Sequence, residues 1–368
     1  MFDRRLIQHF DWVLLLLLLL ISAISVLNLY SATYPIRDAG GSQIFMKQIY
    51  WILVGLAVLL ITTTFNYHLL ERLAYPSYFF SLALLILVLL IGKVYSGSQR
   101  WLSLGGISFQ PSELIKLTLI ITLCKFFSAH GEERYEYRLR DLWKPFFLIS
   151  LPCLLIIKEP DLGTALILFV AAFSIILFAK IHWKSILILV IACMVMVPFL
   201  WSTLKEYQQK RILTFINPEM DPLGAGYHIN QSKIAIGSGL FWGKGYLKGT
   251  QTRLHFLPEQ HTDFAFSVLA EEWGFLGSVF LMLLYLVLIL WGINIARDSK
   301  DRFGSLLALG ITAVVFWQWV TNVGMSTGLL PVVGVPLVLF SYGGSSLVSM
   351  MAGMGLLMNI SMRRFMFP

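Results

Sequence analysis

The sequence carries little charge for its length. Only 13% of its 368 residues are Asp, Glu, Lys or Arg, while 57% are hydrophobic. Soluble domains carry about a quarter charged residues. This scarcity of charge excludes an ordinary water-soluble domain, and lipid is the expected solvent for most of the chain.

The patterns of several other protein classes are also missing. The three cysteines, Cys124, Cys153 and Cys193, lie inside apolar stretches without the CxxC or Cys/His spacing of a metal site. The apolar stretches do not alternate with polar residues as the strands of a membrane barrel do. HExxH, GxGxxG and GxxxxGK[ST] are absent, so no zinc protease or nucleotide-binding loop is predicted. The formal net charge of +8 comes from residues spread over the loops, which favours phospholipid or phosphate over nucleic acid as the anionic partner.

Long apolar stretches dominate the chain instead. They predict a single all-α, polytopic membrane domain over residues 1–368, whose first stretch is retained rather than cleaved as a signal peptide. An even number of spans puts both termini on one side, and the basic residues of the short loops gather there, which predicts that this side is cytoplasmic. Ten transmembrane helices are expected, at 11–31, 47–66, 76–94, 111–129, 143–158, 162–181, 183–203, 264–297, 303–326 and 339–362.

A long periplasmic loop, 204–263, is expected between the seventh and eighth helices, and it is longer than a connector requires. The eighth helix, 264–297, would be about 50 Å long if it were straight. Because this exceeds one span, we expect a break near Gly274, with a half-helix from Asp263 to Trp273 at the outer interface.

Several charged residues lie at the outer ends of the predicted helices, where unpaired charge is costly. Glu113 and Lys116 share a helix face, either as a local ion pair or as the lining of a polar cavity. Asp161 lies in the tight turn after Glu159, either as a helix cap or as a functional group. Asp263 is either a cap or a general base whose pKa is raised by burial and lowered by nearby cations.

Basic residues of the long loop are candidates for contact with a pyrophosphate or, alternatively, with anionic lipid headgroups. They are Lys233, Lys244, Lys248 and Arg253.

Four motifs, taken together and in this order, resemble the SEDS family of shape, elongation, division and sporulation proteins. They lie at 109–113, 221–228, 257–264 and 341–345. The stretches 231–239 and 249–251 are similar to the elongation branch of that family rather than to its division branch. The resemblance covers essentially the whole chain. It departs at Gly239-Leu240-Phe241, where relatives commonly have Gly-Gly-Leu, and at Val338, where they often have proline.

The resemblance implies a peptidoglycan glycosyltransferase of the bacterial inner membrane that polymerises lipid II, an undecaprenyl-pyrophosphate disaccharide-pentapeptide, during cell elongation and rod-shape maintenance. It implies a partner, a class B penicillin-binding protein that acts as the transpeptidase of the elongation complex. It gives Asp263 the catalytic role, with Glu113, Lys116, Asp161 and Arg100 as supporting or cavity residues. Candidate substrate contacts are Lys233, Lys244, His261 and Ser345.

In this hypothesis, Asp263 takes the proton of the acceptor 4-hydroxyl as that oxygen attacks the donor anomeric carbon with inversion. Lys116, Arg100 or loop lysines would neutralise the leaving pyrophosphate, or a divalent cation such as Mg²⁺ or Mn²⁺ would do so. The alternative is a lipid II flippase, since intramembrane charges also mark translocation paths. The acids cluster toward the outside, however, and no inverted repeat is visible. A scaffold that only recruits the partner would tolerate Asp263→Asn.

Overall fold

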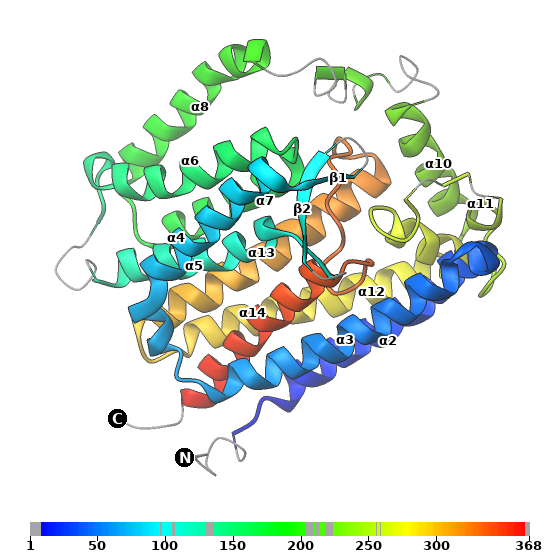
Figure 1. The fold of residues 1–368 in the computed structure, drawn as a ribbon, viewed down its shortest axis with the longest axis horizontal. Helices are drawn as coiled ribbons and strands as arrows, with labels where there is room; N and C mark the ends of the chain where they lie inside the picture. The colour runs from blue at the N-terminus through cyan, green and yellow to red at the C-terminus, as the bar shows by residue number, and fades with distance from the viewer. Residues whose placement is uncertain are drawn as a thin grey trace.

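The computed structural model describes residues 9–95, 98–104, 107–129, 136–203, 209–210, 213–215, 217, 224–254, 256–257 and 259–364. Parts of the predicted motifs, namely residues 221–223 and 258, and much of the loop 204–263 lie outside the described residues. Within them the chain forms a bundle of long helices (Figure 1), which agrees with the predicted all-α class.

The first part of the chain supplies most of the helices. They are α2 (Trp12–Thr33), the 3₁₀ turn η1 (Tyr34–Ala39), α3 (Gly41–Thr64), α4 (His68–Ile91), α5 (Pro111–Ala129), the 3₁₀ turn η2 (Leu139–Asp141), α6 (Trp143–Lys158), α7 (Leu162–Phe178) and α8 (Trp183–Thr203). The second part contributes α10 (Ala225–Ser238), α11 (Thr250–Arg253), α12 (Ala265–Arg297), α13 (Arg302–Thr327) and α14 (Gly344–Arg363). In the described part of the chain, α2, α3, α4, α12, α13 and α14 are long and apolar enough to cross a membrane.

The largest differences from the predicted helix boundaries are at the starts of three helices, whereas the other ends differ by three residues or fewer. α3 begins at Gly41 and α4 at His68, both earlier than expected. Polar residues interrupt the apolar pattern in these first turns, namely Ser42 and Gln43 in α3 and His68, Glu71 and Arg72 in α4. α14 begins at Gly344 rather than at residue 339, and an irregular segment that contains Pro331 and Pro336 precedes it. Proline removes a backbone donor and disfavours the helical conformation of the residue before it, which keeps this segment from joining the helix.

A small antiparallel sheet, which the sequence analysis did not predict, lies between α4 and α5. Its strands are β1 (Lys93–Tyr95), β2 (Ser98–Leu104) and β3 (Ile107–Phe109), in the order β1-β2-β3. Leu102 pairs with Phe109 and Leu104 with Ile107. The sheet matters for function because β2 carries Arg100 and Trp101.

Small residues allow α3 and α14 to pack closely. A Cβ at Gly55 would lie 2.8 Å from Cδ2 of Leu347, and a Cβ at Gly355 would lie 1.9 Å from Oγ1 of Thr62. Close approach through small residues is the usual way for helices to pack in lipid, where no hydrophobic force drives them together.

The start of α2 and the end of α14 lie at the same end of the bundle. Asp11 caps α2 by accepting from the backbone N of Leu14 at 3.0 Å, and its carboxylate also accepts from Oγ of Ser361 in α14 at 2.7 Å and from Nε1 of Trp291 in α12 at 3.0 Å. α10 and α11 lie at the opposite end (Figure 1). We call the end with α10 and α11 the outer end.

The expected break in the eighth predicted helix is confirmed. Gly274 in α12 has φ +64° and ψ −157°, a conformation that only glycine adopts without strain. The turn 239–245 fills the break by pairing with the backbone groups that the two helix ends leave open. Its bonds are Phe275 N to Leu240 O (2.9 Å), Leu276 N to Phe241 O (3.3 Å), Lys244 N to Glu271 O (3.0 Å) and Gly245 N to Glu272 O (3.0 Å).

Candidate active site

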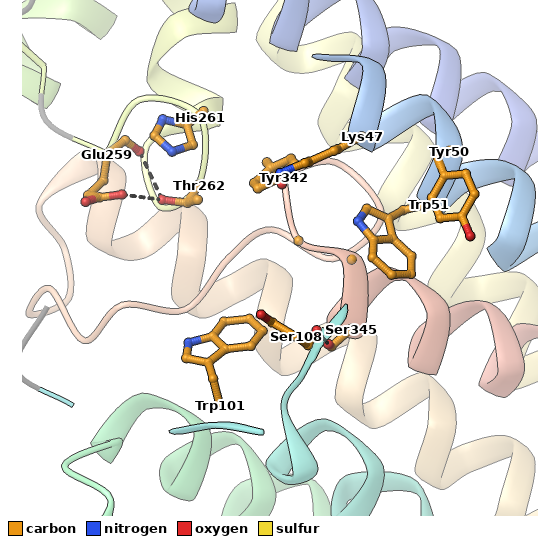
Figure 2. Close-up of a pocket in the computed structure, with 12 residues that line it drawn as sticks. Lys47, Tyr50, Trp51, Trp101, Ser108, Glu259, His261, Thr262, Tyr342 and Ser345 are labelled. Carbon is orange, nitrogen blue, oxygen red and sulfur yellow. Dashed lines mark hydrogen bonds between the residues drawn. The ribbon is translucent and has the colours of Figure 1, made fainter. Parts of the chain in front are cut away.

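An open cavity of about 640 Å³ lies at the outer end of the bundle. Its volume falls in the usual range of small-molecule sites. Figure 2 shows side chains from α3, β2, the turn before α12 and the start of α14 around it. The lining consists of Lys47, Tyr50, Trp51, Trp101, Ser108, Glu259, His261, Thr262, Tyr342, Gly343, Gly344 and Ser345. Aromatic rings thus make much of the wall, with a few polar groups among them.

One wall comes from a single face of α3. Lys47, Tyr50 and Trp51 stand three and four residues apart, which places them on the same side of the helix. The ring of Trp51 packs directly on Gly344, where a Cβ would lie only 2.5 Å from Cε2 of the indole. Because Gly344 has no side chain, the indole of Trp51 can pack against its backbone in the cavity lining.

The turn 259–263 forms the facing wall. The backbone N of Tyr342 donates to the carbonyl of His261 at 2.9 Å, and Oγ1 of Thr262 donates to Oε2 of Glu259 at 3.1 Å. Burial lowers the pKa of His261, and the nearby charge of Glu259 acts in the opposite direction. The imidazole is therefore neutral near pH 7, with one nitrogen able to donate and the other able to accept a hydrogen bond.

Asp263 is half-buried and is the last residue of this turn. Among the described residues, the lining of the cavity includes Thr262 but not Asp263. The side chain of Asn322 in α13 holds the aspartate backbone, because its Nδ2 donates to the carbonyls of Asp263 and Val335, both at 2.8 Å. Oδ2 of Asp263 lies 3.5 Å from where a Cβ of Gly334 would stand. α12 begins at Ala265 with Phe264 as its N-cap residue, so Asp263 does not occupy the cap position.

A hydrogen-bonded chain links the cavity to Asp161. Oγ of Ser345 accepts from the backbone N of Gln110 at 3.2 Å and donates to the carbonyl of Ser108 at 3.4 Å. Nε2 of Gln110 donates to Oδ2 of Asp161 at 3.3 Å, and Nη1 of Arg100 lies 3.4 Å from the same oxygen. The structure therefore brings together Ser345, Asp161 and Arg100, three residues selected from the sequence.

Asp161 is a helix cap, one of the two alternatives that the sequence left open, and it also forms an ion pair. Its Oδ1 accepts from the backbone N of Thr164 at 3.2 Å, so it caps α7, and it also pairs with Arg100. Glu159, two residues earlier, is fully buried, and neither of its carboxylate oxygens has a hydrogen-bond partner among the described residues. Burial, assisted by the charge of Asp161 and opposed by that of Arg100, raises the pKa of Glu159 to about 8. Glu159 is therefore protonated at neutral pH.

Glu113 and Lys116 form a local ion pair in the first turns of α5. Nζ of Lys116 lies 2.8 Å from Oε1 of Glu113, and both residues are almost completely buried. Neither of them lines the described cavity. The pair lies directly after Gln110, whose carbonyl accepts from the backbone N of Glu113 at 3.1 Å. The ion pair therefore lies next to Gln110, the residue that links Ser345 to Asp161.

The two loop lysines lie away from the cavity. Nζ of Lys244 pairs with Oε1 of the buried Glu271 at 2.7 Å and also contacts Oγ1 of Thr250 at 2.7 Å. Lys233 on α10 is exposed, and its stem packs against Gly328, where a Cβ would lie 2.1 Å from Cε. Lys244 thus anchors the turn 239–245 to the half-helix.

Sequence reasoning missed much of the cavity wall. The sequence analysis singled out neither Lys47 nor Trp51 and Trp101. The spacing of Lys47, Tyr50 and Trp51 was a signal, but aromatic and basic residues at a helix start are equally typical of a membrane interface. Within the described ranges, no group of three or more His, Cys, Asp or Glu side chains is arranged to hold a metal ion.

Bacterial peptidoglycan glycosyltransferases have sequences similar to this one over almost its whole length. The chain is 40% identical over 359 residues to peptidoglycan glycosyltransferase MrdB of Escherichia coli K12, covering 97% of this chain and 95% of the relative. It is 32% identical to peptidoglycan glycosyltransferase RodA of Treponema pallidum, with 97% and 99% covered.

Solved structures agree with these sequence relationships. A chain from the structure of a peptidoglycan synthase complex superposes with a TM-score of 0.83 at 32% identity, covering 97% of this chain and 99% of that one. The rod shape determining protein RodA of Thermus thermophilus superposes with a TM-score of 0.71 at 30% identity, with 97% and 98% covered. The model of the FtsW/RodA/SpoVE family of cell cycle proteins matches residues 11–365, and the chain belongs to this family.

Proposed function

We propose that this protein is a peptidoglycan glycosyltransferase that polymerises lipid II into glycan strands during cell elongation, with its active site at the outer face of the membrane. The observation that carries the proposal is the cavity at the outer end, walled by aromatic rings and by Lys47 and His261, with Asp263 next in the chain to Thr262 of its lining. Relatives that match almost the whole chain are named peptidoglycan glycosyltransferases.

The proposed topology has ten membrane spans, formed by α2 to α8 and α12 to α14, in a bacterial inner membrane. The start of α2 and the end of α14 lie together at one end of the bundle, which agrees with an even number of spans. Because the basic residues of the short loops gather at that end, we place both termini in the cytoplasm. The cavity then faces the periplasm, where the glycan is built.

The proposed reaction is a single displacement with inversion. The 4-hydroxyl oxygen of the acceptor sugar forms a bond to the donor anomeric carbon as the bond from that carbon to the pyrophosphate oxygen breaks. The hydroxyl proton passes to the carboxylate of Asp263, and the electron pair of the broken bond leaves with the pyrophosphate. The amide of Asn322 fixes the backbone of Asp263, so the base is held in place by a buried group.

The remaining residues bind and neutralise the substrate. Trp51 and Trp101 offer flat apolar surfaces for sugar rings, and neutral His261 and Ser345 offer hydrogen bonds. Lys47 in the cavity wall and Arg100, which precedes the lining residue Trp101 in β2, would neutralise the departing pyrophosphate. A divalent cation, Mg²⁺ or Mn²⁺, could neutralise the pyrophosphate in their place, and the displacement described above does not require one. Lys233 and Lys244 would serve only at the periphery.

The proposed partner is a class B penicillin-binding protein, whose transpeptidase would crosslink the new strands. A similar solved structure belongs to a peptidoglycan synthase complex, which supports a two-enzyme assembly in the membrane.

The proposal is tested with the purified protein, its partner transpeptidase and labelled lipid II in detergent. Wild type should produce glycan strands, and Asp263→Asn should reduce the rate by about 10² to 10⁴, the usual contribution of a general base. Asp298→Asn, the same change in an exposed ion pair at the opposite end of the bundle, should retain activity. Unchanged polymerisation by Asp263→Asn would disprove the assignment of the base. Transport of lipid II across vesicles without polymerisation would favour the flippase alternative.

A further inference from the structure

The turn 239–245 exposes an apolar tip. Leu240, Phe241 and Trp242 are 80%, 50% and 77% exposed. We call these three residues the 240–242 tip. Three consecutive large apolar side chains directed outward at the end of a loop need an apolar surrounding that the described fold does not supply.

The tip cannot withdraw from its exposed position, because the turn that carries it is tightly seated. Four backbone hydrogen bonds join the turn to the break in α12. The ion pair between Lys244 and the buried Glu271 adds a side-chain link between the turn and the half-helix. The backbone contact is so close that a Cβ at Gly243 would lie 2.1 Å from the carbonyl oxygen of Glu272, and one at Gly239 would lie 2.0 Å from that of Ala270.

The tip is continuous with the outward face of α12. The ring of Phe241 stacks on that of Phe275 with centroids 5.8 Å apart, and Phe275, Leu276 and Phe280 are exposed as well. α12 is one of the helices long and apolar enough to cross a membrane. The exposed face of such a helix contacts lipid, so the apolar surface extends without interruption from the lipid-facing helix to the tip.

The length of α12 gives the height of the tip. Residues 275–296 contain no charged residue, and as a helix they are about 33 Å long, close to the hydrocarbon thickness of about 30 Å. Arg297 marks the inner polar boundary at one end. The break at Gly274, and the tip bonded beside it, then lie at the outer boundary between acyl chains and headgroups.

We propose that the 240–242 tip is an interfacial anchor, inserted into the headgroup and glycerol region of the outer leaflet. Tryptophan is the residue typical of this layer. The stem of exposed Lys248 lies over Gly245, 3.4 Å from where its Cβ would stand, where its ammonium group can reach lipid phosphates. Since the same turn is bonded to the half-helix 265–273, the anchor fixes the height of that half-helix and of Asp263 relative to the bilayer.

The test uses the full-length protein in lipid nanodiscs without its partner. A fluorophore is attached to Trp242→Cys and, in a second variant, to Leu240→Cys, whose exposed side chain makes the substitution mild. Both are made in a background in which the three natural cysteines are replaced by alanine. Quenching by lipids with nitroxides at different depths, and by iodide in water, then measures the depth of the label. Arg253→Cys, exposed on α11 of the same loop, is the matched control.

Labels at 240 and 242 are expected about 15 Å from the bilayer centre, half the hydrocarbon thickness, while the label at 253 is quenched by iodide alone. Adding the partner transpeptidase should leave the lipid quenching unchanged. If both tip labels respond to iodide as the control does, the tip lies in water and the proposal is wrong. If the partner abolishes lipid quenching, the tip is a protein-binding surface instead, and the anchor is likewise refuted.

Discussion

The buried ion pair of Glu113 and Lys116 allows a sharp test of what supports the candidate site. Lys116→Met keeps the length of the apolar stem and removes the ammonium group that lies 2.8 Å from the Glu113 carboxylate. Because Glu113 is almost completely buried, its charge would then stand without compensation. Removing one partner of a buried pair costs about 3–5 kcal/mol, so we expect a clear loss of thermal stability and of glycan synthesis.

Two further variants separate charge compensation from packing. Glu113→Leu combined with Lys116→Met removes both charges, and replacing a buried pair by apolar residues is often neutral or stabilising, so stability should return. Lys125→Met makes the same change in the same helix, where the ammonium group lies 5.0 Å from the ring centroid of Tyr75, and should cost only about 0.5–1 kcal/mol. Thermal unfolding in one detergent measures all of them.

The ion-pair reasoning is refuted if Lys116→Met unfolds at the temperature of wild type, or if the double variant is no more stable than the single one. A stable double variant that makes no glycan would place these charges in the reaction itself.

Three other perturbations have defined outcomes. Because burial raises the pKa of Glu159 from 4.5 to about 8, the folded state keeps a proton that the unfolded chain has lost, and stability falls as pH rises between these values. Glu159→Gln should remove this slope, which is at most about 1.4 kcal/mol per pH unit, in thermal unfolding from about pH 5 to pH 9; an unchanged slope would contradict it. Gly274→Ala should destabilise the fold by about 1–3 kcal/mol from backbone strain alone, whereas Gly237→Ala, where a Cβ meets nothing within 4 Å, should be neutral or stabilising; equal unfolding temperatures would count against the reasoning. Asn322→Ala leaves the carbonyls of Asp263 and Val335 without this donor, at about 1–3 kcal/mol each, and should reduce kcat for glycan synthesis by displacing Asp263, the proposed base; wild-type kcat would show that the amide does not position Asp263 for the reaction.

Hydropathy and helix length predicted the features of the fold that the local composition of the chain determines. The positions of the long helices and the break at Gly274 follow from the length of the apolar stretches, because the bilayer sets one length for every span. α10 was missed because its polar residues lack that signal. The sheet that carries Arg100 and Trp101 was missed too, because its short strands are stabilised by pairing with each other, which no local propensity encodes.

The sequence predicted charged residues of the candidate site, but not how these residues and the cavity walls come together in space. Asp161 and Arg100 were selected separately, but only the turn of the chain at Pro160 and the sheet bring them within 3.4 Å. The wall formed by Lys47 and Trp51 depends on α3 packing against the start of α14, a contact between segments almost three hundred residues apart that the sequence does not reveal. Lys244 drew attention as a free cation, yet the structure pairs it with Glu271, because a charge in sequence carries no information about its partner.

The hydrogen bond from Ser361 to Asp11 has a consequence for how the chain can be cut and rejoined. Since the start of α2 and the end of α14 meet at one end of the bundle, a short linker can connect these two helices without crossing the bilayer. New termini opened in the η2 region between α5 and α6 would lie on the same side. Such a circularly permuted protein would keep every buried contact around Asp263, so the order in which the helices are synthesised could be altered while the cavity stays as it is.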